Sequence, residues 1–232
     1  MNRTGPITIP TGKELEALFQ SGQMACLGMG RRRCCYRIPG TSLCVKAYRT
    51  LDGREHVENQ TIRREIEHNR FSERRNTSCN EWDYFQELKA RLPQSLLDVF
   101  PGVFERVCVP SRGWCLVEEL IANADGTPSV SIETEFRRRP WGDGKAFLAK
   151  AIRQIRKLGE ELARCAVRFY DPPNILAQFS EDGEFRLRIA DFEPMPRTFI
   201  ALEALGPLFV SLKVRRRFGR YRRRLEEWRG TT

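Results

Sequence analysis

The sequence predicts an α+β fold of two parts, in which a small antiparallel sheet comes first and a short, mainly helical part follows. Between residues 24 and 48, Gly and Pro separate three short runs rich in Cys, Val, Tyr and Ile, which is typical of antiparallel strands joined by tight turns. Between residues 145 and 167, apolar residues recur with the period of an amphipathic helix. We therefore divide the chain into the ranges 1–122 and 123–232.

The first part is expected to begin with a helix, because Thr11 and Glu14 have the spacing of a capping box and the helix can end near Gly22. Three strands, bounded by glycine or proline, are expected at 24–27, 33–38 and 42–48. Residues 51–79 are highly charged and lack a broad apolar face, which indicates an exposed insertion with some helix. An amphipathic helix at 80–91 follows. Two further strands are expected at 102–109 and 114–121.

The second part is expected to contain the strongest helix of the chain, at 145–167, followed by a β-hairpin. The hairpin strands are expected at 175–179 and 185–190, around a turn at 181–183. In the second of these strands apolar residues alternate with arginines, which predicts one buried and one solvated face. Two further helices are expected, one near 200–205 and a basic one at 214–228.

The net charge of +10 is concentrated near the end of the chain. Residues 213–229 contain nine Lys or Arg against two Glu, which favours an anionic partner: acidic phospholipid, nucleic acid or a phosphorylated protein. An apolar stripe also runs along this helix, formed by Leu212, Phe218, Tyr221, Leu225 and Trp228. A basic amphipathic helix of this kind can lie on an anionic membrane surface, and an ordinary solvated helix is the alternative. Nucleic acid is less favoured, because few aromatic residues lie between the charges.

Features of the whole chain favour a cytoplasmic protein, with peripheral association with the inner membrane as a further option. No stretch of 18 apolar residues occurs, and the first residues lack the apolar segment of a secretory signal. The eight cysteines include no C-x2-C pair, and His56 and His68 are the two histidines, so a zinc site is not expected. Four cysteines are expected to pack as small apolar groups within strands: Cys26, Cys44, Cys108 and Cys115.

Four features of the sequence suit the binding of a magnesium nucleotide. Gly28 and Gly30 lie at the end of a strand, where glycine lets the backbone approach a phosphate and leaves amides free to point at it. Lys46 lies in the middle of an apolar strand, where an ammonium group is costly unless it finds an anionic partner. Asn174 and Asp191 stand on either side of the predicted hairpin, so their side-chain oxygens can converge on one Mg²⁺.

Each of these positions also has a simpler interpretation. A Gly-x-Gly segment is most often only a turn, Lys46 could extend to solvent from an edge strand, and Asn174 could cap a turn. The partner of Lys46 is predicted to be Glu81, which shares a helix face with apolar residues and therefore points toward the core. Glu65 is the second choice for this pairing.

On these residues the chain resembles the YrbL family of bacterial proteins (PhoP regulatory network protein YrbL), which has a protein-kinase-like fold. Four stretches carry the resemblance: residues 27–36 with 44–46, 81–88, 117–129, and 172–176 with Asp191. The segments 28–36 and 125–129 are fairly specific to this family, and the others are shared with kinases broadly. The resemblance implies two lobes, a small antiparallel-sheet N-lobe and a short, truncated, mainly helical C-lobe.

The resemblance also implies ATP and Mg²⁺ as cofactors. The residues that it assigns to the nucleotide are Gly28, Gly30, Lys46, Glu81, Glu118, Glu119 and Leu120. The glycines would cover the phosphates, Lys46 would contact them while paired with Glu81, and the backbone of the last three residues would contact adenine. Asn174 and Asp191 would hold the metal. Lys46 and Asp171 are the candidate catalytic residues, with Asp171 as a general base.

Departures from a protein kinase leave the chemistry open. Phe169 stands where a kinase has its catalytic Asp, and Glu193 stands where the glycine of Asp-Phe-Gly is expected. Asp171, two residues after Phe169, is either a displaced base or the cap of the following proline turn. One hypothesis is therefore an atypical phosphotransferase acting on a small or envelope- or lipid-linked acceptor. The alternative is an inactive, pseudokinase-like scaffold for a regulatory protein, whose basic helix binds a membrane surface or nucleic acid.

Overall fold

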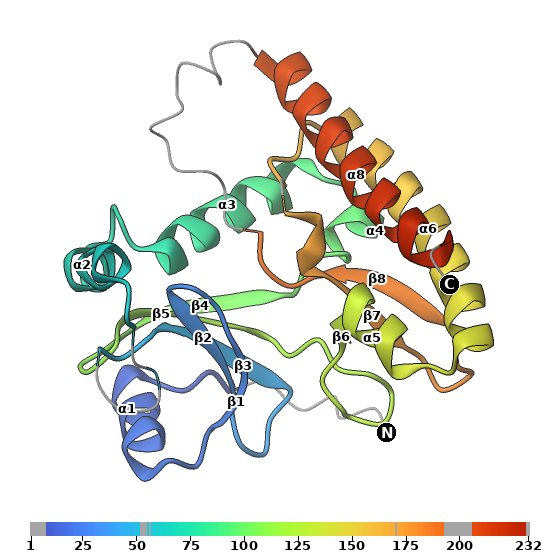
Figure 1. Ribbon diagram of the computed structural model, residues 1–232. Helices are drawn as coiled ribbons and strands as arrows, with labels where there is room; N and C mark the ends of the chain where they lie inside the picture. The colour runs from blue at the N-terminus through green and yellow to red at the C-terminus, as the bar shows by residue number, and fades with distance from the viewer. Residues whose placement is uncertain (1–7, 52–54, 56, 170, 193–205, 231–232) are drawn as a thin grey trace. The chain divides into compact units, whose positions relative to one another are not determined.

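The computed structural model describes residues 8–51, 55, 57–169, 171–192 and 206–230, and these belong to two compact units. Unit 1 comprises Met1–Phe85 and Gly102–Leu120, and unit 2 comprises Gln86–Pro101 and Ile121–Thr232. Unit 1 contains a five-stranded antiparallel sheet, whereas unit 2 is mostly helical, so the α+β class is confirmed (Figure 1). The helix expected near 200–205 and the position of Glu193 lie outside the described residues.

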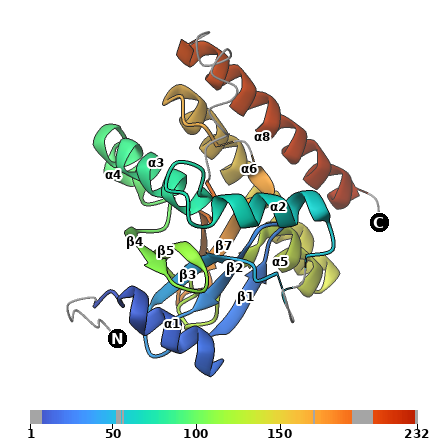
Figure 2. The ribbon, with the colours of Figure 1, turned by 90° about the vertical axis from the view of Figure 1, so that its left-hand side faces the viewer.

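Unit 1 is built on its sheet, in which the strands follow the order β1-β2-β3-β5-β4 and each pairs antiparallel with its neighbours (Figure 2). The strands are β1 (Ala25–Met29), β2 (Arg33–Arg37), β3 (Leu43–Tyr48), β4 (Val103–Val109) and β5 (Gly113–Glu119). The helices are α1 (Gly12–Ser21), α2 (Gln60–Asn69) and the first part of α3 (Thr77–Arg91). The five predicted strands are confirmed, and their ends differ from these bounds by at most two residues.

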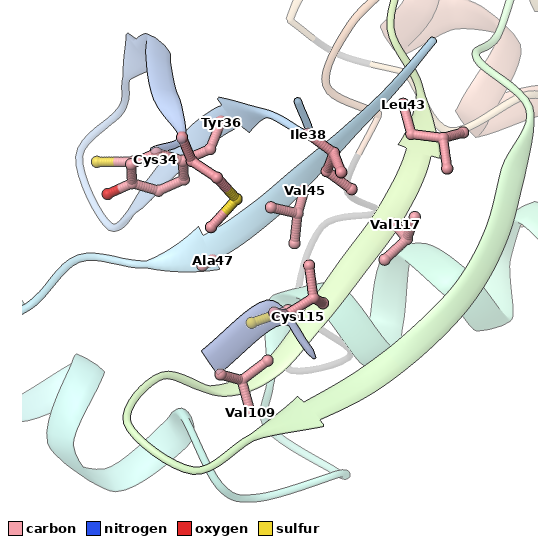
Figure 3. Packing of buried hydrophobic residues seen from close by; sticks show 11 residues of the cluster. Cys34, Tyr36, Ile38, Leu43, Val45, Ala47, Val109, Cys115 and Val117 are labelled. Atoms are coloured by element: carbon pink, nitrogen blue, oxygen red, sulfur yellow. The ribbon is translucent and has the colours of Figure 1, made fainter. Parts of the chain in front are cut away.

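One face of this sheet forms the main core of unit 1 together with α1 (Figure 3). Val45 and Ala47 of β3 pack there with Cys115 and Val117 of β5, and Leu15 of α1 is fully buried among them. Because side chains alternate along a strand, the residues between these four belong to the opposite face of the sheet. All six residues of β3 are buried, so both faces of this central strand are covered.

Helix α1 has the predicted ends. The Glu14 amide donates to Thr11 Oγ1 at 3.4 Å, and the Thr11 amide donates to Glu14 Oε2 at 2.7 Å. Gly22 ends the helix with a φ of 67°, a left-handed conformation that glycine adopts at little cost. The capping box expected from the sequence is therefore confirmed.

The charged segment 51–79 contributes more to the core than expected. Within it, α2 buries Ile62 and Ile66, four residues apart, against Tyr48 and Val57. The helix expected at 80–91 also begins earlier, since α3 starts three residues sooner and its first turn is buried. Two isoleucines at helical spacing are thus enough to anchor a helix that is otherwise polar.

Unit 2 combines a small sheet with two long helices. Its elements are the end of α3, α4 (Gln94–Leu97), β6 (Val130–Ser131), α5 (Ile132–Arg138), α6 (Trp141–Arg164), η2 (Pro172–Asn174), β7 (Ile175–Phe179), β8 (Phe185–Ile189) and α8 (Gly206–Gly230). β6, β7 and β8 form an antiparallel sheet, which confirms the predicted hairpin. The expected solvated face of β8 is wrong in part, because Arg188 is buried and donates to Phe100 O at 3.1 Å and Gln178 Oε1 at 2.9 Å.

Helix α6 spans Trp141–Arg164 instead of the predicted 145–167. Its C-cap is Cys165, and the next residue, Ala166, has a φ of 48°, in the left-handed region. The amides of Ala166 and Val167 donate to carbonyls of the preceding turn at 3.1 and 2.9 Å, which are the two hydrogen bonds of a Schellman motif. Glycine usually occupies this position, so the sequence carries no obvious signal for the end of the helix.

Replacing Ala166 with Gly is expected to raise the free energy of unfolding by roughly 0.5–1 kcal/mol, because the left-handed conformation strains a residue with a Cβ and the greater flexibility of unfolded glycine offsets only part of that gain. Urea unfolding would measure the change. As a control, Ala146→Gly at an exposed position within α6 is expected to lower stability by about 1 kcal/mol. Destabilisation by both substitutions would contradict the proposed strain at Ala166.

Helix α8 packs antiparallel along α6 through an apolar stripe (Figures 1 and 2). The buried residues of the stripe are Val210, Val214, Phe218, Tyr221 and Leu225. Ser211 Oγ donates to Ala163 O, and further along Phe218 lies so close to Gly159 that a Cβ there would be 2.6 Å from its ring. Most of the apolar stripe of α8 that was predicted as a possible membrane contact is therefore buried, although Leu212 is 56% exposed. No helix in the described residues is long and apolar enough to cross a bilayer.

Candidate functional site

Unit 1 contains a buried network of opposite charges centred on Glu81 of α3. Glu81 is fully buried, and its two oxygens accept hydrogen bonds from Lys46 Nζ at 2.7 Å and from Arg33 at 2.8 Å. Lys46 Nζ also lies 3.1 Å from an oxygen of Glu118. The predicted Lys46–Glu81 pair is confirmed, whereas Glu65 pairs with a different residue, an arginine at the surface.

Strand register brings these side chains to one face of the sheet. Lys46 lies on the face opposite the main core, directly across the ladder from Cys35 of β2, and Arg33 is two residues before Cys35 on the same face. In β5, Val117 points into the main core, so Glu118 points toward Lys46. This alternation was the available signal for Glu118 and Arg33, although only the backbone of Glu118 was predicted to take part in the site.

The Glu118 carboxyl group is strongly perturbed. Burial raises its pKa to about 8, against the lowering effect of the Lys46 ammonium group, and the negative charge of Glu81 raises it further. At neutral pH Glu118 is therefore mostly protonated, and its other oxygen, Oε2, has no hydrogen-bond partner among the described residues. The network of Arg33, Lys46, Glu81 and protonated Glu118 then carries one net positive charge, which suits an anionic ligand.

The cysteines of the sheet differ in environment. The pKa of Cys35, which faces the charge network, is lowered by a hydrogen bond with the Cys44 thiol, against the raising effect of burial. The same hydrogen bond, together with burial, raises the pKa of Cys44. The prediction that strand cysteines are buried is confirmed for Cys44 and Cys115, but it is wrong for Cys26 and Cys108, which are exposed on the two edge strands β1 and β4.

The glycines predicted to cover a phosphate lie at the β1–β2 turn. Gly28 sits at a bulge, where the strand pairing shifts after Cys26, and Gly30 donates its amide hydrogen to Arg33 O at 2.8 Å. Both glycines are exposed, and no atom lies within 4 Å of the Cβ that another residue would add at Gly28. The backbone at this turn is therefore open to close approach by a ligand.

The segment 118–120 uses much of its backbone within unit 1. The Glu119 amide donates to Gly102 O at 2.7 Å, and the Leu120 amide donates to Ser42 O at 2.8 Å. Glu119 O also accepts from the Cys44 thiol at 3.7 Å, so two donors and one acceptor of this segment are already in use.

Unit 2 contains the residues predicted to hold a metal. The β7–β8 ladder pairs Ile175 with Ile189, so Asn174 and Asp191 lie at the same end of the hairpin. Asn174 Nδ2 donates to Asp171 Oδ2 at 3.2 Å. Partial burial and the negative charge of Asp191 raise the pKa of Asp171. The fold thus brings two carboxylates and one amide together within unit 2.

Phe169, which stands where the resemblance to kinases would place an acidic base, has a packing role. It is 2% exposed, and its ring meets Phe218 of α8 edge-on, with centroids 6.0 Å apart. Because α8 also packs against η2, the positive charge of Arg217 lies close enough to Asp171 to oppose part of the rise in its pKa. Arg217 is far from Asp171 in the sequence, so tertiary structure was needed to connect them.

Each unit has its own group of polar residues, and the two groups suit different chemical groups. The described residues contain no set of three His, Cys, Asp or Glu side chains that could hold a metal ion, but Mg²⁺ needs only one or two carboxylates plus phosphate and water oxygens. Asp171, Asp191 and the Asn174 amide meet that smaller requirement, and a divalent cation would offset the repulsion between the carboxylates. The charge network and the open glycine turn of unit 1 suit phosphate groups.

No protein-family model matches this chain, and no curated protein sequence matches it. The resemblance to the YrbL family and the kinase-like identity of the α+β fold therefore stay predictions. The function must be argued from the residues of the two units themselves.

Proposed function

We propose that this chain is a kinase-like protein of the YrbL type that binds a magnesium nucleotide. The observation that supports this most is the network of Lys46 and Glu81, held on the sheet face that adjoins an exposed glycine turn. In this proposal Lys46 binds the nucleotide phosphates, Gly28 and Gly30 approach them with their backbone, and carbonyls of 118–120 accept from the base.

Asn174 and Asp191 would hold the metal in this proposal. When bound, Mg²⁺ would neutralise charge on the phosphates. We also assign a phosphate-binding role to Arg217, because α8 brings this cation beside Asp171, where kinases usually have a lysine in the catalytic loop. In this way a residue of the basic C-terminal helix becomes part of the site.

The reaction proposed is phosphoryl transfer to a small or envelope- or lipid-linked acceptor, with Asp171 as the base. Loss of a general base typically costs about 10²–10⁴ in rate, but positioning and electrostatics carry most of phosphoryl transfer, so the substitution at Phe169 does not remove the activity by itself. The second candidate is a pseudokinase that binds the nucleotide without turnover. It is favoured by the burial of Phe169 against Phe218, since this position now serves packing.

Saturating Mg-ATP is expected to raise the melting temperature of the protein by about 5–10 °C, because a ligand at about 100 times its Kd adds roughly 2.7 kcal/mol to a domain of this size. Gly28→Ala is expected to keep the unliganded melting temperature, since its Cβ meets open space, and to weaken nucleotide binding about tenfold. Asp191→Asn is expected to weaken binding in the presence of Mg²⁺ by a similar factor. Differential scanning fluorimetry would measure the melting temperatures, and calorimetric titration would measure the nucleotide affinities.

Glu181→Gln is the matched control for Asp191→Asn, because it removes an exposed carboxylate from the turn of the same hairpin. Absence of any stabilisation of the wild type by Mg-ATP would contradict nucleotide binding. Phosphate release measured on the wild type and on Asp171→Ala separates the two candidates. Turnover that Asp171→Ala abolishes favours the enzyme, and stabilisation without turnover favours the pseudokinase.

A further inference from the structure

A basic groove runs between α6 and α8 in unit 2, with a volume of about 810 Å³. Its cationic side chains are Arg156, Lys157 and Arg164 from α6 and Arg215 and Arg222 from α8. The acidic side chains that line it are Glu160 and Glu161 of α6, so positive charges exceed negative ones by three. The groove is separate from the residues assigned to the nucleotide and the metal.

The cations of the groove are largely uncompensated. Arg156, Lys157, Arg164 and Arg215 form no ion pair or hydrogen bond through their side chains within the described part of the chain, although two glutamates line the same groove. Arg222 lies 3.4 Å from Glu226, one turn further along its own helix. Several unpaired guanidinium groups in one concavity raise the local positive potential and favour an anionic ligand.

The arginines are spaced along the groove. Since α6 and α8 are antiparallel, Arg164 and Arg215 lie toward the end marked by the Ser211–Ala163 contact, and Arg156 and Arg222 lie toward the other end. The seven steps from Arg215 to Arg222 correspond to about 10 Å along a helix at 1.5 Å per residue. A ligand with one phosphate would meet only one end, whereas a polymer with repeated phosphates can contact both.

We propose that this groove binds the sugar–phosphate backbone of a nucleic-acid strand. Guanidinium groups donate paired hydrogen bonds to phosphate oxygens, and a linear groove with cations on both walls can contact successive phosphates of a strand. A flat membrane surface fits less well, because five apolar residues of α8 are buried and the exposed ones, Leu208 and Leu212, lie near the start of the helix. Phe218 is the aromatic residue of the groove and is 4% exposed, so it offers no surface for base stacking. The binding is therefore insensitive to sequence and sensitive to salt.

Fluorescence anisotropy with labelled single-stranded RNA and DNA 20-mers of mixed sequence tests the proposal on the full chain. The groove variant is Arg156→Ala/Arg164→Ala/Arg215→Ala. The matched control, Arg216→Ala/Arg220→Ala/Arg223→Ala, removes the same charge from exposed α8 positions that do not line the groove. Because all six side chains are exposed, both variants are expected to keep the wild-type melting temperature.

The groove variant is expected to lose at least tenfold in affinity for the strand, while the control loses threefold or less. The slope of log affinity against log salt is expected to fall by about two in magnitude in the groove variant, since each phosphate contact on a single strand contributes about 0.7. No binding by the wild type at 50 mM salt, or equal losses in the two variants, would overturn the proposal. The proposal would also be overturned if the wild type bound vesicles of anionic phospholipid more strongly than the strands and if only the control variant weakened that binding. That result would identify a membrane surface as the partner instead.

Discussion

Glu81→Ala is expected to lower the free energy of unfolding by about 3–5 kcal/mol, which is a large part of the stability of an ordinary domain. Glu81 is fully buried and accepts from both Lys46 and Arg33. Its removal leaves two cations in the interior without their shared carboxylate, and Glu118, 3.1 Å from Lys46, is close to only one of them. Urea unfolding at pH 7, followed by circular dichroism, would measure the loss.

Glu65→Ala is the control for this prediction. Glu65 forms an ion pair with Arg32 at 2.8 Å, but both side chains are about one third exposed, so the loss is expected to stay below about 1 kcal/mol. If Glu81→Ala cost no more than Glu65→Ala, the buried network would not be the electrostatic centre of unit 1.

Glu118→Gln is expected to make the protein more stable than the wild type at pH 8 and no more stable near pH 4.5. In the folded protein the pKa of Glu118 is about 8, raised mainly by burial from an ordinary value of 4.5, so between these pH values the folded state holds a proton that the unfolded state has released. The free energy of unfolding of the wild type therefore falls as the pH rises through this window. The Gln side chain has the same shape but does not titrate. At pH 8 the free energy of unfolding of Glu118→Gln is therefore expected to exceed that of the wild type by on the order of 2 kcal/mol or more.

Unfolding curves of the wild type and Glu118→Gln from pH 4.5 to 9 would measure this difference, with Glu119→Gln, at a less buried neighbouring position, as the control. A constant difference across the range would contradict the raised pKa. The same titration bears on the proposed function: ionisation of Glu118 above pH 8 cancels the net positive charge of the network, so nucleotide affinity is expected to fall there in the wild type and not in Glu118→Gln.

The sequence was most informative where local pattern and tertiary structure agree. The pairing of Lys46 with Glu81 followed from one strand and one helix face, each with a clear apolar pattern. The hairpin that brings Asn174 and Asp191 to the same end followed from alternation and a turn. In the hairpin, the residues between Asn174 and Asp191 fix the strand register, so their proximity is encoded locally. The pairing of Lys46 with Glu81 joins a strand to a helix 35 residues away, and it could be predicted because each side chain lies on the buried face of its own element.

The remaining features depend on contacts between distant parts of the chain. The docking of α8 on α6 needs Gly159, whose role is visible only beside Phe218. The end of α6 at Ala166 has no sequence signal because alanine is an excellent helix former. The position of Arg217 near Asp171 follows from that docking and from no local pattern.

The contact between Phe169 and Phe218 also limits how this chain can change by mutation. An acidic residue at position 169 would need only altered codon bases, yet it would place a carboxylate in a nearly solvent-free position and remove the ring that meets α8. An acidic residue at this position would therefore require a compensating change in α8 first. Phe169 thus ties the residue that the kinase-like proposal would need as a base to the packing of the C-terminal helix.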